Sequence, residues 1–189
     1  MASGHDHDRA TLLVCIPFGL LLLPLMGPQA FGAGAGAFLV GGLWLSPDLD
    51  TASKPLHRWG PLRWIWWPYQ RLVPHRSLLS HGPLIGMGLR LLWLLTCVLL
   101  SWMLLRSLLL MLQGATPPGL ELTPIQALIR RLVLVAQDHP RPLIATALGL
   151  EASVWLHLLL DGDPLPVEWH RHLKRSRMRR RDRRHRRRR

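Results

Sequence analysis

Four long apolar stretches constrain the fold of this chain more than any other feature. They cover residues 10–26, 29–45, 84–112 and 142–160, and the first two contain no charged residue. A helix on the surface of a soluble protein needs a polar face, and a chain of 189 residues is too small to bury four such helices inside protein. Since about 17–20 apolar residues cross a bilayer as a helix, we expect an all-α fold: a compact bundle of about four transmembrane helices.

The two long connections between these stretches differ in character. Residues 48–83 are rich in Pro, Trp and basic residues. Residues 113–141 contain an amphipathic stretch, 123–137, which is typical of an extra helix that lies on the membrane surface or caps the bundle.

Basic residues in the connections predict how the chain is oriented in the membrane. The connection 48–83 holds five Lys or Arg residues against two acidic ones, and the C-terminal segment is also strongly basic. Lys and Arg collect in cytoplasmic loops. The chain is therefore expected to be a multi-pass protein of a bacterial membrane with both termini cytoplasmic and the 113–141 connection outside.

The formal charge of +13 belongs almost entirely to the C-terminal segment. Residues 170–189 contain thirteen Lys or Arg and one Asp. Such a segment is too charged to fold alone, so we expect a helical membrane domain at 1–166 and a disordered basic tail at 167–189. Lipid is the expected partner of the spans. Anionic inner-leaflet lipid, which contributes about 1 kcal/mol per basic residue, is expected for the tail in preference to non-specific nucleic acid. No specific nucleic-acid partner is expected.

Histidine and aspartate residues gather in four short segments that could carry chemistry. The four-span topology, derived from loop charge and the number of spans and not from these residues, places each segment at the cytoplasmic end of a helix. Each of these residues, taken alone, has an ordinary structural explanation. Their convergence on one face of the membrane favours a shared site. The segments are His5–Asp8, Asp48 with Asp50, His75–His81 including Arg76, and His157 with Asp161.

Spacing and donor type make these segments suitable for a metal ion. His157 and Asp161 are four residues apart and lie on one helical face. Carboxylate and imidazole donors without thiolates suit zinc, manganese, iron or magnesium. Asp48 and Asp50 lie in a turn, where they could hold one ion or bridge two. Two neighbouring ions are a common arrangement for phosphoester hydrolysis.

The order of these motifs adds a family resemblance. The patterns run from Ser3 to Asp8, from Gly42 to Asp50, from His75 to His81 and from His157 to Asp161. Together they resemble a bacterial family of uncharacterised membrane proteins described as predicted metal-binding proteins, similar in outline to the LexA-regulated membrane-bound metal-dependent hydrolases. The resemblance implies a metal site made by His7, Asp48, Asp50, His75, His81, His157 and Asp161.

The leading functional hypothesis is a membrane-embedded, metal-dependent hydrolase of a phosphoester or lipid-linked substrate. Asp50 is its expected general base, Arg76 would hold an anionic group, and zinc is the first candidate metal, before manganese, iron or magnesium. The alternatives are a non-catalytic metal-binding or metal-handling protein, and a membrane scaffold whose basic tail binds anionic partners.

Two finer expectations concern single residues. Because His7 lies closer to the first span, we expect it to be a ligand and His5 a bystander in a terminus that is poorly ordered by default. Ionisable groups within spans usually have a partner in the bundle, so Glu151 is expected to pair with Arg90.

Overall fold

Every regular element in the described part of the chain, residues 2–114 and 123–162, is a helix. The structure is a computed structural model, and it confirms the expected all-α fold. Its long helices are α1 (Gly4–Met26), α2 (Pro28–Leu43), α6 (Ile85–Leu112), α7 (Thr123–Asp138) and α8 (Pro140–Leu160). Its short helices are η1 (Pro47–Asp50), α3 (Lys54–His57), η2 (Gly60–Trp66), α4 (Trp67–Leu72) and α5 (Leu78–His81). The predicted boundary at 166 and the predicted tail, 167–189, lie outside the described residues.

Four helical segments are long and apolar enough to cross a membrane. They are Gly4–Met26, Pro28–Asp50, Ile85–Leu112 and Pro140–Leu160, and they correspond to the four predicted spans. The first begins at Gly4 rather than at residue 10 because Ser3 caps it. The Ser3 side chain accepts from the backbone N–H of Asp6, and the Asp6 carboxylate accepts from the backbone N–H of Ser3. The His/Asp segment at the N-terminus therefore lies on the helix itself.

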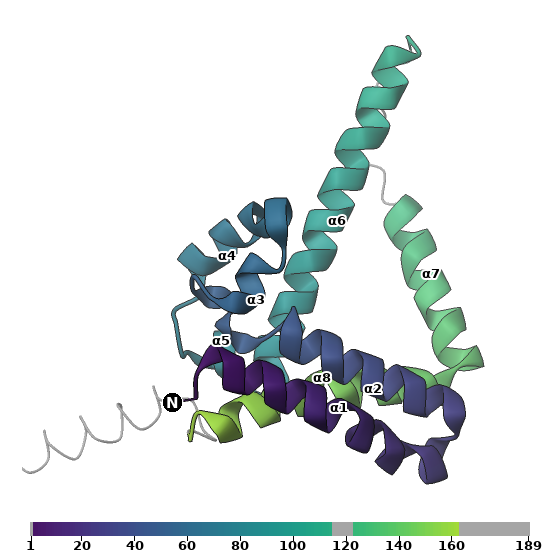
Figure 1. Ribbon diagram of the computed structural model, residues 1–189. Helices are drawn as coiled ribbons and strands as arrows, with labels where there is room; N and C mark the ends of the chain where they lie inside the picture. Colours follow the sequence, from purple (N-terminus) through teal and green to yellow (C-terminus); the bar gives the residue numbers. More distant parts are fainter. Residues whose placement is uncertain (1, 115–122, 163–189) are drawn as a thin grey trace, which may run out of the picture.

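Helices α1, α2 and α8 lie side by side and form the bundle (Figure 1). Small residues let their backbones approach closely, as is usual between helices in lipid. A Cβ atom added to Gly149 of α8 would lie 2.3 Å from the carbonyl oxygen of Gly34 in α2. A Cβ atom added to Gly19 of α1 would lie 2.8 Å from the Cβ of Ala35. Glycine at these positions thus sets the spacing of the three helices.

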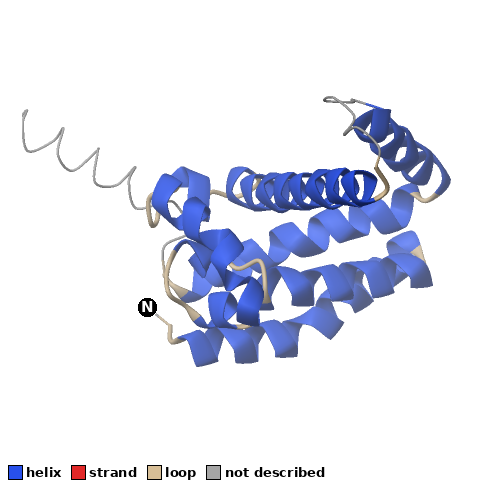
Figure 2. Ribbon diagram, turned by 90° about the horizontal axis from the view of Figure 1, so that it is seen from above, coloured by secondary structure: helices blue, strands red, loops and turns tan. Residues whose placement is uncertain are grey.

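Helix α6 runs away from this bundle (Figure 1). Its buried residues, Gly86, Met87 and Arg90, all belong to its first turns. The indole N–H of Trp93 donates to the carbonyl oxygen of Ile65 at 3.0 Å, which fixes the same end to η2. Helix α7 is the expected amphipathic helix, and its C-terminal end lies next to the N-terminal end of α8 (Figure 2). One end of α6 therefore belongs to the bundle, whereas the rest extends beyond it.

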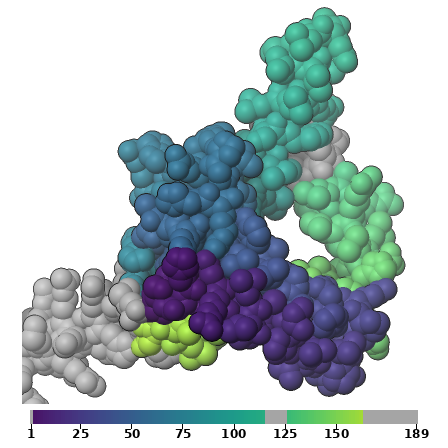
Figure 3. Space-filling view, viewed as in Figure 1, coloured from purple at the N-terminus to yellow at the C-terminus, as the bar shows by residue number. Residues whose placement is uncertain are grey.

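The connection between α2 and α6 folds into a cap around a buried aromatic pair. Trp66 and Tyr69 are almost wholly buried and meet edge to face, with ring centroids 5.5 Å apart. The Gln70 amide donates to the carbonyl oxygens of Leu49 and Thr51 at 3.0 and 3.1 Å, which fixes η1 against the cap. Figure 3 shows this connection lying against the first turns of α1.

Candidate metal centre

The four His/Asp segments meet at one end of the bundle. His7 comes from the first turns of α1, and the aspartates of the second segment come from η1. His75 precedes α5, and His81 ends it. His157 lies in the last turn of α8, with Asp161 as its C-cap. The structure thus brings together the seven residues predicted as ligands, while the presence of an ion stays a prediction.

Three groups of ligand atoms are close enough to hold an ion. Within each group the atoms lie within 4.8 Å of one another, and neighbouring groups share one histidine. The groups are His7, His157 and Asp161; Asp48, His81 and His157; and Asp50, His75 and His81. The site is therefore a continuous row of alternating imidazoles and carboxylates.

Two histidine nitrogens face one carboxylate oxygen at the middle of the row. Asp48 Oδ1 lies 3.6 Å from His157 Nε2 and 3.8 Å from His81 Nε2. These distances are too long for hydrogen bonds, and both nitrogens are buried without a hydrogen-bond partner. Ligands held at about 2.0–2.3 Å around a tetrahedral ion lie about 3.3–3.8 Å apart. The separations therefore suit an ion bound between these three side chains better than direct contact between them.

Ser80 orients the imidazole of His81. The Ser80 hydroxyl donates to the carbonyl oxygen of Pro74 at 3.1 Å, and it lies 2.9 Å from His81 Nδ1. This contact holds the ring at Nδ1, and which of the two atoms donates depends on the tautomer of His81. Metal-ligating histidines usually donate their other N–H to such a partner. Ser80 is a site residue that the sequence analysis missed, because a lone serine carries no ligand signal.

Helix α1 contributes its histidine to one end of the row. His7 Nε2 lies 3.2 Å from Asp161 Oδ1, and its ring stacks on that of His157 with centroids 4.1 Å apart. His5 is exposed. The next acidic residue, Asp8, forms ion pairs with Arg58 and Lys54 and so ties α1 to the cap.

A buried carboxylate marks the other end of the row. Asp50 Oδ1 lies 2.9 Å from His75 Nδ1, whereas Oδ2 lies 3.6 Å from His81 Nδ1 and has no hydrogen-bond partner. The Asp50 side chain is wholly buried, and that of His75 is 46% exposed. A buried carboxylate oxygen without a donor is costly, so this oxygen also suits a cation.

Backbone strain frames the segment between His75 and α6. Arg76 and Leu84 have φ angles of +58° and +60°, which side-chain-bearing residues rarely adopt. The Arg76 guanidinium lies 3.5 Å from Asp161 Oδ2. Such strain persists only where the surroundings impose it, and here it turns Arg76 toward the carboxylate at the end of α8.

The expected Glu151–Arg90 pair is wrong as a direct contact, since each side chain forms a hydrogen bond to another group. Glu151 Oε1 accepts from the backbone N–H of Leu84 at 2.8 Å, which holds the strained start of α6. Arg90 is fully buried and donates to the carbonyl oxygen of Ser80 at 2.8 Å. Both contacts fix the residues around His81.

Nearby in the cap, burial raises the pKa of the Tyr69 phenol, which therefore stays neutral.

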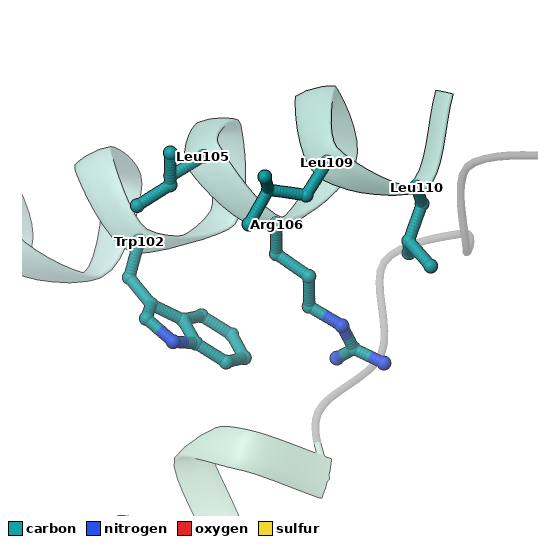
Figure 4. Close-up of a pocket in the computed structure, with 5 residues that line it drawn as sticks. All are labelled: Trp102, Leu105, Arg106, Leu109 and Leu110. Atoms are coloured by element: carbon teal, nitrogen blue, oxygen red, sulfur yellow. The ribbon is translucent and has the colours of Figure 1, made fainter. Parts of the chain in front are cut away.

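A cavity of about 300 Å³ lies elsewhere, near the far end of α6 (Figure 4). Trp102 and Arg106 point to the same side of the helix there, beside leucines. The lining includes no His or carboxylate, and Trp102 is roughly 25 Å along the helix from Ile85 at a rise of 1.5 Å per residue. We therefore place the chemistry at the His/Asp row and not in this cavity.

Within the described residues, fold and site define an all-helical protein with four helices long and apolar enough to cross a membrane and a partly buried His/Asp cluster that could hold a metal ion. The chain belongs to the family described as "Uncharacterized metal-binding protein (DUF2227)", which it matches over residues 2–172. It is also similar to an "Uncharacterized protein" of Aquifex aeolicus (strain VF5), with 37% identity over 75 residues. That match covers 39% of this chain and 50% of the relative. No solved structure matches the chain.

Proposed function

We propose that this chain is an integral membrane protein that holds a divalent metal ion in the His/Asp row and uses it to hydrolyse a phosphoester or lipid-linked substrate. The arrangement of Asp48, His81 and His157 carries the proposal. Two buried imidazole nitrogens without partners face one carboxylate oxygen at 3.6 and 3.8 Å. Family membership supports metal binding, and the hydrolytic step rests on the chemistry of the site.

The donor set fits a divalent transition metal. The row offers imidazole nitrogens and carboxylate oxygens, and the two described cysteines, Cys15 and Cys97, lie in α1 and α6 outside the three ligand groups. Such donors suit zinc first, with manganese, iron or magnesium as alternatives. When bound, the ion would supply Lewis-acid polarisation of water and of a phosphoryl oxygen.

Two side chains of the row have proposed roles toward the substrate. Arg76 is 25% exposed and lies beside Asp161, where its guanidinium can bind an anionic oxygen. Asp50 is the proposed proton acceptor, since one of its oxygens has no hydrogen-bond partner. Because the row lies at one end of helices suited to a bilayer, a substrate with its phosphoester at the membrane surface would reach it without leaving the lipid.

Hydrolysis of a generic phosphodiester tests this function. Detergent-purified protein should hydrolyse bis(p-nitrophenyl) phosphate. This activity should be lost when a chelator removes the metal and should return when zinc or manganese is added. Arg76→Ala should raise KM by about 10–100-fold, because hydrogen bonds to charged groups contribute about 1.5–3 kcal/mol. Arg63→Ala changes an exposed arginine of the same connection and should leave KM unchanged.

The alternatives predict other outcomes of this assay. Bound metal without turnover would favour a metal-handling protein. A chain that binds no metal would favour a scaffold, whose basic segment 167–189 we propose to contact anionic lipid.

Membrane orientation is a separate prediction of the proposal. Both termini should be cytoplasmic, because the basic connection 48–83 and the basic C-terminal segment lie on the same side. A reporter fused after Arg189 should be active only in the cytoplasm, and one inserted between residues 113 and 122 only in the periplasm. The reverse pattern would place the His/Asp row on the outer face and exclude a cytoplasmic substrate.

A further inference from the structure

We infer that the row holds two metal ions, one in each terminal ligand group, with Asp48 lying between the two groups. This inference rests on the proposed metal binding and concerns the number of ions and the division of ligands. The first group is His7, His157 and Asp161, and the second is Asp50, His75 and His81. The two terminal groups share no residue and have the same composition, two imidazoles and one carboxylate.

The reach of a metal ion argues against one ion serving all seven residues. Bonds of about 2.0–2.3 Å keep two ligands of one ion within about 4.6 Å of each other. The ligand atoms of the described residues form three groups, each with its atoms within 4.8 Å of one another, and not one group of seven. The row is therefore longer than one ion can coordinate.

A single ion at the middle of the row is the competing arrangement. It would use Asp48, His81 and His157 and leave His7–Asp161 and His75–Asp50 as outer hydrogen-bonded pairs. Outer pairs of this kind do orient ligands in many metal sites. The number of ions therefore depends on whether every buried polar atom of the outer pairs has a partner in the absence of an ion.

The Asp50 carboxylate decides between the two arrangements. Its Oδ1 has His75 as a partner, but Oδ2 is buried, has no hydrogen-bond partner and lies 3.6 Å from His81 Nδ1. An ion at the middle of the row would leave Oδ2 buried and unsatisfied, which costs free energy. An ion in the second group supplies its missing partner.

The position of Asp48 completes the division. One oxygen of this residue faces His157 of the first group at 3.6 Å and His81 of the second at 3.8 Å. The side chain is 28% exposed, so it borders the solvent where a substrate would arrive.

Counting zinc ions per chain in detergent-purified, zinc-loaded protein tests the inference. Wild type should contain two ions. His7→Ala and His75→Ala should each contain one, because each change breaks a different terminal group. His5→Ala and His57→Ala remove exposed histidines outside the three groups and should keep two.

One ion in wild type, retained in both His7→Ala and His75→Ala, would overturn the two-ion inference and leave metal binding intact. An empty wild-type protein would overturn both. Electron paramagnetic resonance of wild-type protein loaded with manganese gives a second measurement that needs no variant. Two ions in the neighbouring terminal groups should show a spin-coupled spectrum, whereas the six-line signal of isolated manganese alone would contradict the inference.

Discussion

Replacing both His81 and His157 with alanine is expected to abolish metal binding. Each of the three ligand groups contains at least one of these histidines, so the double variant leaves none complete. Even residues that only orient a ligand contribute about 10–100-fold to metal affinity, so losing two ligands should reduce affinity by more than about 100-fold. Elemental analysis of the purified variant should find metal only at background.

The matched control is the double variant His5→Ala/His57→Ala, which also removes two imidazoles but only exposed ones. It should bind as much metal as wild type. Circular dichroism of the metal-free proteins should show the same helix content in both double variants, because α1, α2 and α8 pack through residues away from the row. A His81→Ala/His157→Ala protein that is folded and fully loaded would contradict the assigned site.

Substituting Gly149 with alanine should cause a large loss of stability for the addition of a single methyl group. The new Cβ would lie 2.3 Å from the carbonyl oxygen of Gly34 and 2.9 Å from the backbone nitrogen of Phe38. Backbone atoms cannot rotate away, so α2 and α8 must separate. Overpacking of this kind costs about 1–3 kcal/mol, and a denaturant titration in detergent should measure it.

Gly36→Ala is the control for this change, because it makes the same substitution on a helix of the same bundle. Gly36 is exposed, and a Cβ there meets nothing within 4 Å. Alanine is also a better helix former than glycine by about 1 kcal/mol. We expect neutral or slightly higher stability for Gly36→Ala, and equal destabilisation of both variants would refute tight packing of α2 against α8.

The helices were predictable because their signals are local. Apolar length alone gave the four candidate spans, and amphipathic periodicity gave α7. The start of α1 at Gly4 was missed, although Ser3 and Asp6 already stand at capping-box spacing. The direction of α6 was not predictable, because a helix that is apolar all round carries no information about which neighbour it faces.

The site was partly predictable for a similar reason. His and Asp at fixed spacings stand out in an apolar chain, and charge in the connections placed them on one face. Ser80 could not be found, because its role depends on a hydrogen bond to the carbonyl oxygen of Pro74. The Glu151–Arg90 pairing failed because the exposed backbone N–H of Leu84 competes for the same carboxylate, and no sequence pattern reveals such a donor.

The metal content of the wild-type protein tests the central claim most directly. Protein purified in detergent would be stripped with chelator, incubated with zinc or manganese, desalted and subjected to elemental analysis. We predict at least one tightly held ion per chain, released again when the pH is lowered enough to protonate the histidine ligands. A folded chain that remains metal-free after incubation with zinc, manganese, iron and magnesium would contradict the assignment of the His/Asp row as a metal centre.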